Sequence, residues 1–249
     1  MHKFFLSPQN IVLEEATIIG EDVKHIYKVL RLNVGENIII NNGNGEEYLG
    51  EITYIDKSFV KAKFIEKLEI NNESPINIHL FQGLPKATKM DIIVQKNTEL
   101  GIKEITPIIT SRVDVKLKGE FKKLDRLQRI ALEASKQSKR TLIPKINEPL
   151  DFKSFMEDIK TMDLVVVPYE DEVNLTIRDI VKSLDVESIK NVAIIIGPEG
   201  GFEKEEIKEL KEEGAKIVTL GPRILRTETA GFTATTLIQY ELGDLGGIN

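Results

Sequence analysis

A glycine-rich segment at residues 197–201, which reads GPEGG, is the first place where the chain could hold a ligand. Three glycines and a proline make a tight turn whose backbone can approach a bound molecule closely. A phosphate at a helix N-terminus prefers basic or hydroxyl side chains, but four glutamates and a single lysine occupy positions 199–206 here. The chain also lacks the GxxxxGK[ST] and GxGxxG motifs. The loop therefore favours a neutral or cationic ligand, and S-adenosylmethionine, a sulfonium without phosphates, fits. A plain strand-to-helix turn would have the same composition.

A second segment, residues 220–229, places Arg223, Arg226 and Glu228 between an apolar strand and an apolar helix. Thr227 can cap that helix, and Glu228 suits its first turn because a carboxylate there complements the helix dipole. This structural interpretation accounts for Thr227 and Glu228. It does not explain why two arginines, Arg223 and Arg226, lie in the same loop.

Composition excludes several classes of site. The 249 residues include no cysteine and only three histidines, His2, His25 and His79, none within four residues of another. Disulfide scaffolds, cysteine nucleophiles and local histidine metal motifs are excluded, and no metal is expected. The longest apolar runs fall far short of the roughly 20 residues that cross a membrane. The opening residues also lack a secretory signal, so a cytoplasmic protein without membrane contact is expected.

Charge is unevenly distributed along the chain. The net charge is −6, yet residues 112–145 carry 11 Lys and Arg against four Asp and Glu. A basic segment of this kind can contact phosphates locally even in an acidic protein. A solvated lysine-rich helix would have the same composition, and charge alone slightly favours that interpretation.

The pattern of elements changes at a polar seam that ends in Pro75, and it predicts two domains, residues 1–72 and 73–249. The first reads as short strands at 37–40, 48–55 and 59–66 with a helix at 21–30, typical of a small antiparallel barrel or sheet. The second alternates strands and helices, which predicts an α/β fold with a mostly parallel sheet. A ligand is then expected outside the carboxyl ends of the strands. Strands are expected at 76–84, 104–110, 164–168, 191–197 and 216–220, and helices at 89–100, 121–138, 152–159, 175–184, 203–213 and 227–242.

Several motifs together resemble one family. They are HIYKVLRL at 25–32, KATKMDIIVQKNTELG at 86–101, EASKQSKR at 133–140 followed by Pro144, GPEGGF at 197–202 and LGPRILRTETA at 220–230. In this order they closely resemble the RsmE-type 16S rRNA (uracil-N3)-methyltransferases of the SPOUT superfamily. One departure concerns the loop at 168–170, where many members have a Leu-His-Pro-like or Pro-x-Glu-like sequence; here it reads PYE, without a histidine. A histidine role at that position does not carry over.

The resemblance implies a PUA-like RNA-binding β-barrel, a SPOUT domain with a deep trefoil knot, and a homodimer. It implies methyl transfer from S-adenosyl-L-methionine to N3 of a uridine in 16S rRNA or the 30S subunit. Arg226 would stabilise the uracil anion, and Glu228 is a weaker candidate for the base. The cofactor would be held by Pro168, Tyr169, Glu170, Gly197, Pro198, Glu199, Gly200, Gly201, Leu220, Gly221, Ile224, Leu225 and Thr229.

RNA contacts are expected from residues in the resembling motifs and the basic region: His25, Arg31, Lys86, Lys96, Arg112, Gln137 and Arg140. For His25 a structural helix histidine is an equal alternative. Three other functions stay open on the sequence: the same fold acting on another RNA atom such as a ribose 2′-oxygen, a non-catalytic RNA-binding protein, and a small-molecule enzyme.

Overall fold

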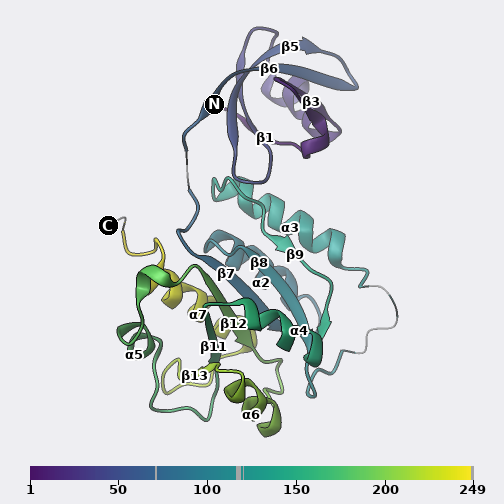
Figure 1. Cartoon of the computed structure of the whole chain (residues 1–249). Coiled ribbons are helices and arrows are strands. Elements are labelled where there is room, and N and C mark those ends of the chain that lie inside the picture. The colour runs from purple at the N-terminus through teal and green to yellow at the C-terminus, as the bar shows by residue number, and fades with distance from the viewer. Residues whose placement is uncertain (71, 116–118, 120, 248–249) are drawn as a thin grey trace. The chain divides into compact units, whose positions relative to one another are not determined.

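The computed structural model describes residues 1–70, 72–115, 119 and 121–247 (Figure 1). The chain forms two compact units. The small unit contains residues 1–73 and 135–143, and the large unit contains residues 74–134 and 144–249. No helix among the described residues has both the length and the hydropathy that a bilayer span requires.

The small unit is a curled six-stranded sheet with the order β1-β4-β5-β6-β3-β2. All pairs are antiparallel except β1 and β4, which run parallel. The expected strands and the helical stretch at 21–30 are present, whereas the pattern did not predict β1, β2 or β3. The strands are β1 (Lys3–Phe5), β2 (Ile11–Val12), β3 (Glu15–Ile19), β4 (Asn37–Asn41), β5 (Glu47–Ile55) and β6 (Phe59–Leu68), with short helices at Pro8–Asn10, Glu21–Lys24 (α1) and His25–Leu30.

The interior of this sheet is apolar because alternate residues of each strand point inward. Ile38 and Ile40 in β4, Ile52 in β5 and Ile18 in β3 are fully buried, and Ile26 of the helical stretch packs against them. The helical stretch closes on Arg31, which adopts a left-handed conformation with φ 55°.

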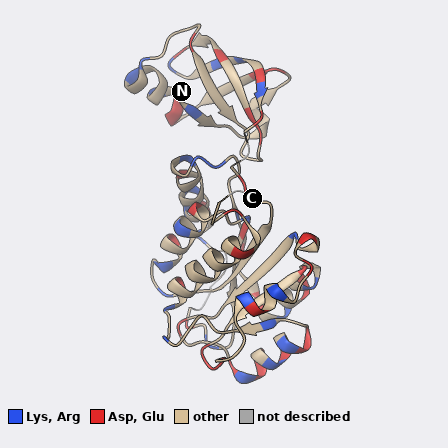
Figure 2. Cartoon of the chain, turned by 90° about the vertical axis from the view of Figure 1, so that its left-hand side faces the viewer, with Lys and Arg blue, Asp and Glu red and all other residues tan. Residues whose placement is uncertain are grey.

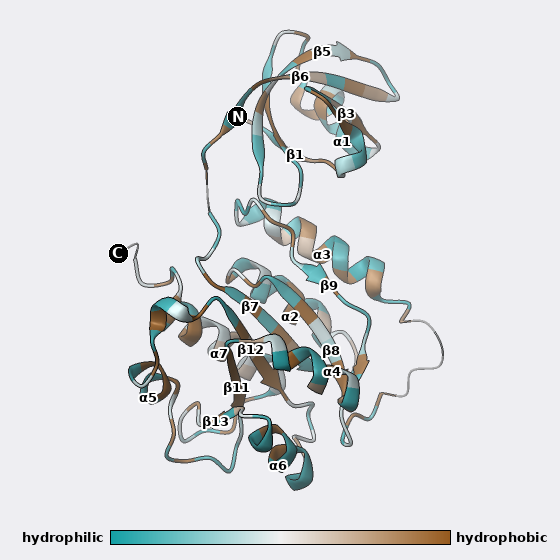
Figure 3. Ribbon diagram, in the orientation of Figure 1, coloured by the Kyte–Doolittle hydropathy of each residue, from teal (hydrophilic) through white to brown (hydrophobic). Residues whose placement is uncertain are grey.

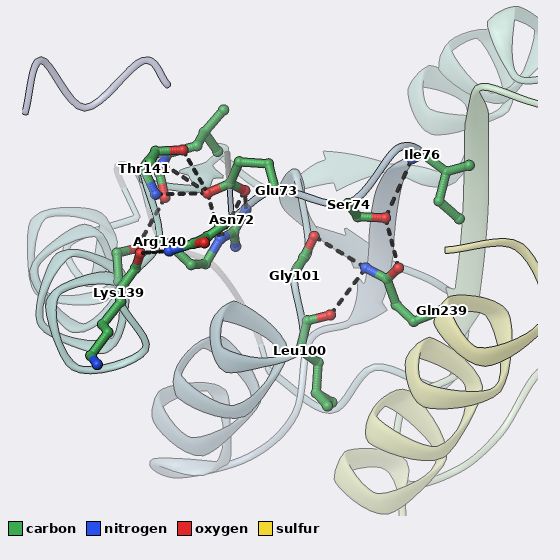
Figure 4. Close-up of polar contacts among 12 residues, drawn as sticks. Asn72, Glu73, Ser74, Ile76, Leu100, Gly101, Lys139, Arg140, Thr141 and Gln239 are labelled. Atoms are coloured by element: carbon green, nitrogen blue, oxygen red, sulfur yellow. Dashed lines mark hydrogen bonds and ion pairs between the residues drawn. The ribbon is translucent and has the colours of Figure 1, made fainter. Parts of the chain in front are cut away.

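Residues 135–143 belong to the small unit, and the Glu73 carboxylate is one of the groups that hold them there (Figure 4). Glu73 accepts hydrogen bonds from the backbone N–H groups of Thr141 at 2.8 Å and Leu142 at 3.0 Å. It also pairs with the guanidinium of Arg140, whose residue is only 3% exposed. A buried charge needs such a partner, so the ion pair between Arg140 and Glu73 attaches residues 135–143 to the segment that follows β6.

The large unit is built on a parallel sheet with the order β10-β8-β7-β12-β11-β13, and β9 pairs with β8. Every pairing in it is parallel, as the alternation of strands and helices predicts. The strands are β7 (Asn77–Gly83), β8 (Glu104–Ile109), β9 (Lys145–Ile146), β10 (Leu150–Asp151), β11 (Leu164–Pro168), β12 (Asn191–Ile196) and β13 (Lys216–Val218). The helices are α2 (Lys89–Glu99), α3 (Leu124–Gln137), α4 (Phe152–Asp158), α5 (Ile177–Lys182), α6 (Lys204–Glu212) and α7 (Thr227–Leu242), with 3₁₀ turns at Ile159–Thr161 and Val186–Ser188.

Both faces of this sheet are covered, which explains why its central strands are almost continuously hydrophobic (Figure 3). Helices α4 and α6 pack with Phe81, Val165 and Ile195 on one face. Helix α7 lies against β7 and β12 and also contacts α2. At the end of α7, the Gln239 amide donates to the carbonyl of Leu100 at 3.1 Å and accepts from the hydroxyl of Ser74 at 2.7 Å (Figure 4). Helix α7 is thereby tied to the start of β7 and the end of α2.

Candidate functional site

Two adjoining hollows lie at the carboxyl ends of β11, β12 and β13. The first measures about 360 Å³ and the second about 400 Å³, and both are lined by Pro168, Glu170, Ile224, Leu225 and Ala230. Because β12, β11 and β13 are parallel neighbours, the loops that follow them emerge on the same edge of the sheet. The sequence expectation that a ligand site lies there matches this geometry.

Most of the residues predicted to bind the cofactor line these hollows. Tyr169, Leu220 and Gly221 line the first, Gly197, Pro198, Glu199 and Gly201 line the second, and Pro168, Glu170, Ile224 and Leu225 line both. Gly200 and Thr229 line neither. A Cβ added at Gly200 would lie 3.0 Å from the Cβ of Arg112, so the missing side chain of Gly200 leaves room for a neighbouring loop. Thr229 is exposed on the first turn of α7.

The first hollow is walled by the loops after β11 and β13. The Tyr169 N–H donates to the Val218 carbonyl at 3.0 Å, which extends the pairing of these strands into the loops. Burial raises the pKa of Tyr169, and the acceptor Asp171 adds to that effect. Gly221 has φ +107°, a conformation that side chains rarely adopt, so this turn requires glycine. The Ile224 side chain is 88% exposed at the rim.

The second hollow is walled by the loop after β12 and by the start of α7. The Thr227 hydroxyl donates to the Gly197 carbonyl at 2.6 Å and accepts from the Gln82 amide at 2.8 Å. One buried hydroxyl therefore joins β7, the glycine loop and α7. A Cβ at Gly83 would lie 2.6 Å from the Gly197 carbonyl carbon, so glycine is required there for the loop to pass.

An ammonium group also lies in the second hollow. The Lys89 Nζ is 3.0 Å from Glu199 Oε1 and 3.5 Å from Glu228 Oε2. The hydrogen bond to Glu199 raises the pKa of Lys89, so the ammonium stays charged. Burial would raise the pKa of Glu199, but hydrogen bonds from Lys89 and from backbone N–H groups outweigh it and the pKa is lowered. The KxxKMD motif contained this residue, but spacing alone did not show what it faces.

The two arginines of the loop after β13 are exposed, and among the described residues neither guanidinium has an ion-pair or hydrogen-bond partner. Arg226 lines the second hollow and Arg223 the first. Glu228 is mostly buried, with a side chain 16% exposed, and within the described part of the chain its Oε2 has no hydrogen-bond donor. Arg226 therefore places a charged donor at the second hollow, whereas Glu228 lines neither hollow and has the Lys89 ammonium as its ion-pair partner.

The residues predicted to contact RNA are spread over both units. In the small unit, His25 and Arg31 belong to the helical stretch and its end, and Gln137 is exposed at the end of α3. In the large unit, Lys96 pairs with Glu99, Lys86 pairs with Asp114, and Arg112 pairs with Glu203. Arg140 is buried against Glu73, which is the arrangement of a structural residue and not of a surface contact.

The lining of the second hollow suits a cationic donor without phosphates. Glu170 and Glu199 contribute carboxylates to it and Lys89 contributes an ammonium, while α6, outside the lining, carries acidic and basic residues together (Figure 2). Gly201, at φ +68°, has its backbone close to Glu170, since a Cβ there would lie 2.7 Å from Glu170 Oε1. These carboxylates offer negative charge to a sulfonium. Among the described residues, no group of three or more His, Cys, Asp or Glu could hold a metal ion.

Comparison with known proteins agrees with this geometry. The RNA methyltransferase domain family matches residues 72–239, and the RNA methyltransferase PUA domain family matches residues 18–65. Ribosomal RNA small subunit methyltransferase E of Bacillus subtilis is 37% identical over 99% of both chains. The protein of the same name from Mesomycoplasma hyopneumoniae is 38% identical over 95% of this chain and 98% of its own.

Solved structures give the same result. Ribosomal RNA small subunit methyltransferase E from Neisseria gonorrhoeae, bound to S-adenosyl methionine, superposes with a TM-score of 0.82 at 30% identity, covering 98% of this chain and 99% of that one. A putative methyltransferase from Legionella pneumophila in complex with the cofactor SAM has the same TM-score at 34% identity, covering 98% of both. The chain therefore belongs to the ribosomal RNA small subunit methyltransferase E family.

Proposed function

We propose that this protein transfers a methyl group from S-adenosylmethionine to N3 of one uridine in 16S rRNA. The observation that carries the proposal is the pair of adjoining hollows at the strand ends, whose lining residues coincide with the motifs of the family. Two relatives with this fold have the cofactor bound in their structures.

The cofactor, when bound, supplies an electrophilic methyl group on sulfur. The loops after β11 and β13 would hold its adenosine in the first hollow, through Pro168, Tyr169 and Leu220. The loop after β12 would hold the methionine part in the second, where Glu170 and Glu199 offer negative charge to the sulfonium. Orientation of the two reactants in one site supplies much of the rate of such a transfer.

The chain's own residues would act on the uracil. The N3–H bond of uracil is weakly acidic, so methylation needs its proton removed as the N3–methyl bond forms and the sulfur–methyl bond breaks. Arg226 would stabilise the negative charge that spreads to the uracil oxygens, because its guanidinium is charged and unpaired among the described residues. Glu228 would accept the proton, and Lys89, which lines the second hollow 3.5 Å from Glu228 Oε2, would connect this carboxylate to the site.

RNA would be held by exposed residues that the motifs single out. Lys86 and Lys96 belong to the large unit, and His25, Arg31 and Gln137 belong to the small unit, whose PUA-type domain is an RNA-binding module by resemblance. We leave Arg140 out of this set because it is buried in its ion pair with Glu73.

A homodimer in the cytoplasm, the compartment of the ribosome, completes the proposal. The exposed side of α7 carries Leu237 and Tyr240, which are 37% and 58% exposed, and apolar exposure of this kind suits a subunit interface. Sedimentation equilibrium of the purified chain gives the mass directly, and a monomer at micromolar concentration contradicts this part.

Mass spectrometry of rRNA nucleosides tests the reaction. A strain that lacks the gene is expected to lose N3-methyluridine from 16S rRNA, and the purified protein with S-adenosylmethionine should restore it to RNA or 30S subunits from that strain. Intact N3-methyluridine in the deletion strain contradicts the proposal. Loss of a 2′-O-methyl group instead would assign the same fold to a ribose oxygen.

A further inference from the structure

The segment that follows β8 contacts the glycine loop and the start of α6 and is not part of the lining of either hollow. The Ser111 N–H donates to Glu206 Oε1 at 2.8 Å, in the first turn of α6. The next residue, Arg112, reaches farther along the same loop. Its Nε and Nη2 donate to the two oxygens of Glu203 at 2.8 and 2.9 Å, and its Nη1 donates to the Gly200 carbonyl at 2.9 Å.

These bonds use the planar shape of the guanidinium. A bidentate pair with one carboxylate and a third bond to a backbone carbonyl need donors in a fixed fork, which a lysine ammonium does not provide. The backbone also fits closely, since a Cβ on Gly200 would lie 3.0 Å from the Cβ of Arg112 and 3.3 Å from its carbonyl oxygen. Gly200 is thus bounded by Arg112 while its neighbours line the second hollow.

Glu203 is held on its other side as well. Its backbone N–H donates to Glu206 Oε2 at 2.8 Å, and the same Glu206 carboxylate accepts from Ser111. A closed chain of bonds therefore runs from the end of β8 through α6 back to the glycine loop. The hydrogen bond from Arg112 lowers the pKa of Glu203, so this carboxylate stays charged in the neutral range.

We propose that Arg112 is a positioning residue for the cofactor, which holds Gly200 and Glu203 from outside so that Gly197, Glu199 and Gly201 keep their places around the methionine part. The inference rests on the proposed function, because it assumes that the second hollow binds S-adenosylmethionine. It replaces the expectation that Arg112 contacts RNA. Three of the guanidinium donors are already bound to Glu203 and to the Gly200 carbonyl, and Glu170 adds negative charge nearby.

Isothermal calorimetry with S-adenosylmethionine alone, without RNA, tests the inference. We expect Arg112→Ala to raise the Kd for S-adenosylmethionine about fivefold to tenfold, the loss expected for a charged, bidentate contact at the surface. Arg112→Lys should lose nearly as much because charge without the fork does not hold the loop. Glu203→Gln should raise this Kd by a similar factor. The double variant with Arg112→Ala and Glu203→Gln should raise it little more than either single substitution does.

The matched control is Arg126→Ala. Arg126 is also an exposed arginine of the large unit, with a side chain 58% exposed, but it pairs with Asp91 on α2. Its removal should leave the Kd for S-adenosylmethionine unchanged. Thermal unfolding of each variant shows whether the large unit still folds.

Binding of a 16S rRNA fragment, measured in the same variants, separates the two roles of Arg112. RNA affinity of Arg112→Ala within about twofold of wild type supports the positioning role, because one phosphate contact normally costs more than that. If Arg112→Ala binds S-adenosylmethionine as wild type does, or if RNA affinity falls and Arg112→Lys restores it, the inference is wrong. If the wild-type chain itself fails to bind S-adenosylmethionine, the proposed function fails first.

Discussion

The two glycine-bearing loops of the large unit meet at the second hollow but are held very differently. The loop after β12 is fixed on several sides, by Arg112 at Gly200, by the Lys86 N–H at Glu199 and by the Thr227 hydroxyl at Gly197. In the loop after β13, all of which the structure describes, the side chains of residues 223, 224 and 226 are exposed. Thr219 makes its local hydrogen bond with the N–H of Gly221.

The difference separates two tasks. A loop with many bonds keeps its shape before a ligand arrives, and less of the binding free energy is then spent on ordering it. A loop with few contacts opens at low cost and can adjust to a ligand or a substrate. We therefore expect the loop after β12 to determine cofactor affinity and the loop after β13 to determine turnover.

The largest expected effect is on turnover, from Arg226→Ala. Removal of a charge that stabilises a developing anion lowers kcat by about 100-fold, whereas the Kd for S-adenosylmethionine should change by about twofold or less. Single-turnover methylation of rRNA and calorimetry measure the two quantities. Arg223→Ala is the control, an exposed arginine three residues away on the same loop. Equal losses of kcat and cofactor affinity in Arg226→Ala would show that the two loops do not divide turnover and cofactor affinity between them.

The next effect is on cofactor affinity, from Gly83→Ala. The added methyl group would meet the backbone of Gly197, 2.6 Å from its carbonyl carbon, and main chain cannot move aside as a flexible side chain can. Such overpacking costs about 1–3 kcal/mol, so we expect the Kd for S-adenosylmethionine to rise by about tenfold or more. Gly231→Ala, where the methyl group meets only the Gln82 side-chain oxygen at 3.3 Å, is the milder comparison. An unchanged Kd in Gly83→Ala would show that the loop after β12 is not fixed.

Thr227→Val should lower the free energy of unfolding by about 1–2 kcal/mol. Valine keeps the shape of threonine but leaves the Gly197 carbonyl and the Gln82 amide without their shared partner in a buried position. Urea denaturation followed by circular dichroism measures the change. Thr229→Val, an exposed threonine on the same turn of α7, should change stability by less than about 0.5 kcal/mol. Equal effects of the two substitutions would mean that the hydroxyl of Thr227 does not join the loops.

The smallest effect is an acid sensitivity at the opposite edge of the sheet. The hydrogen bond with His79 lowers the pKa of Glu104 from 4.5 to about 2 against the effect of burial, with help from Asn147. Because the pKa of Glu104 is lower in the folded chain than its ordinary value of 4.5, the ionised carboxylate stabilises the fold at pH values above 4.5. This contribution disappears as the pH falls from about 4.5 toward 2. Because the group is partly exposed, we expect a loss of about 1 kcal/mol in unfolding free energy.

Urea denaturation at several pH values between about 5 and 2 measures this loss, and Glu104→Gln should flatten it. Glu104 is at the start of β8, whereas both loops follow the ends of strands. Cofactor affinity should therefore not depend on the ionisation of Glu104. If the stability of Glu104→Gln keeps the full acid dependence, another carboxylate causes the effect.

Local sequence predicted the elements of the large unit well. The apolar runs at 164–168 and 191–196 and the helix at 227–242 lie where their patterns place them. Hydrophobic periodicity reports burial, and burial on both faces is what a parallel sheet between helices requires. The position of the site followed from the same logic, since the loops after parallel strands share an edge.

The short strands of the small unit were harder to predict. Strands β1 and β2 have three and two residues, too few for an alternating pattern, and β1 pairs in parallel with β4. Their existence depends on hydrogen bonds to partners far away in the sequence. The assignment of residues 135–143 to the small unit has the same cause, because Glu73 and the turn after β4 hold them through hydrogen bonds.

By itself, the sequence determined the α/β class, the family and the loops that line the two hollows, because periodicity, glycine positions and motifs are local properties of the chain. Tertiary structure decided the partners of the charged side chains. Arg112 meets a glutamate 91 residues later in the chain, Lys89 meets Glu199 and Glu228, and Arg140 is buried with Glu73. A lysine or arginine looks the same in sequence whether it faces solvent, RNA or a carboxylate, and only the folded chain brings it to one of them. The trefoil knot stays a prediction for the same reason, since threading is a property of the whole path and not of any segment.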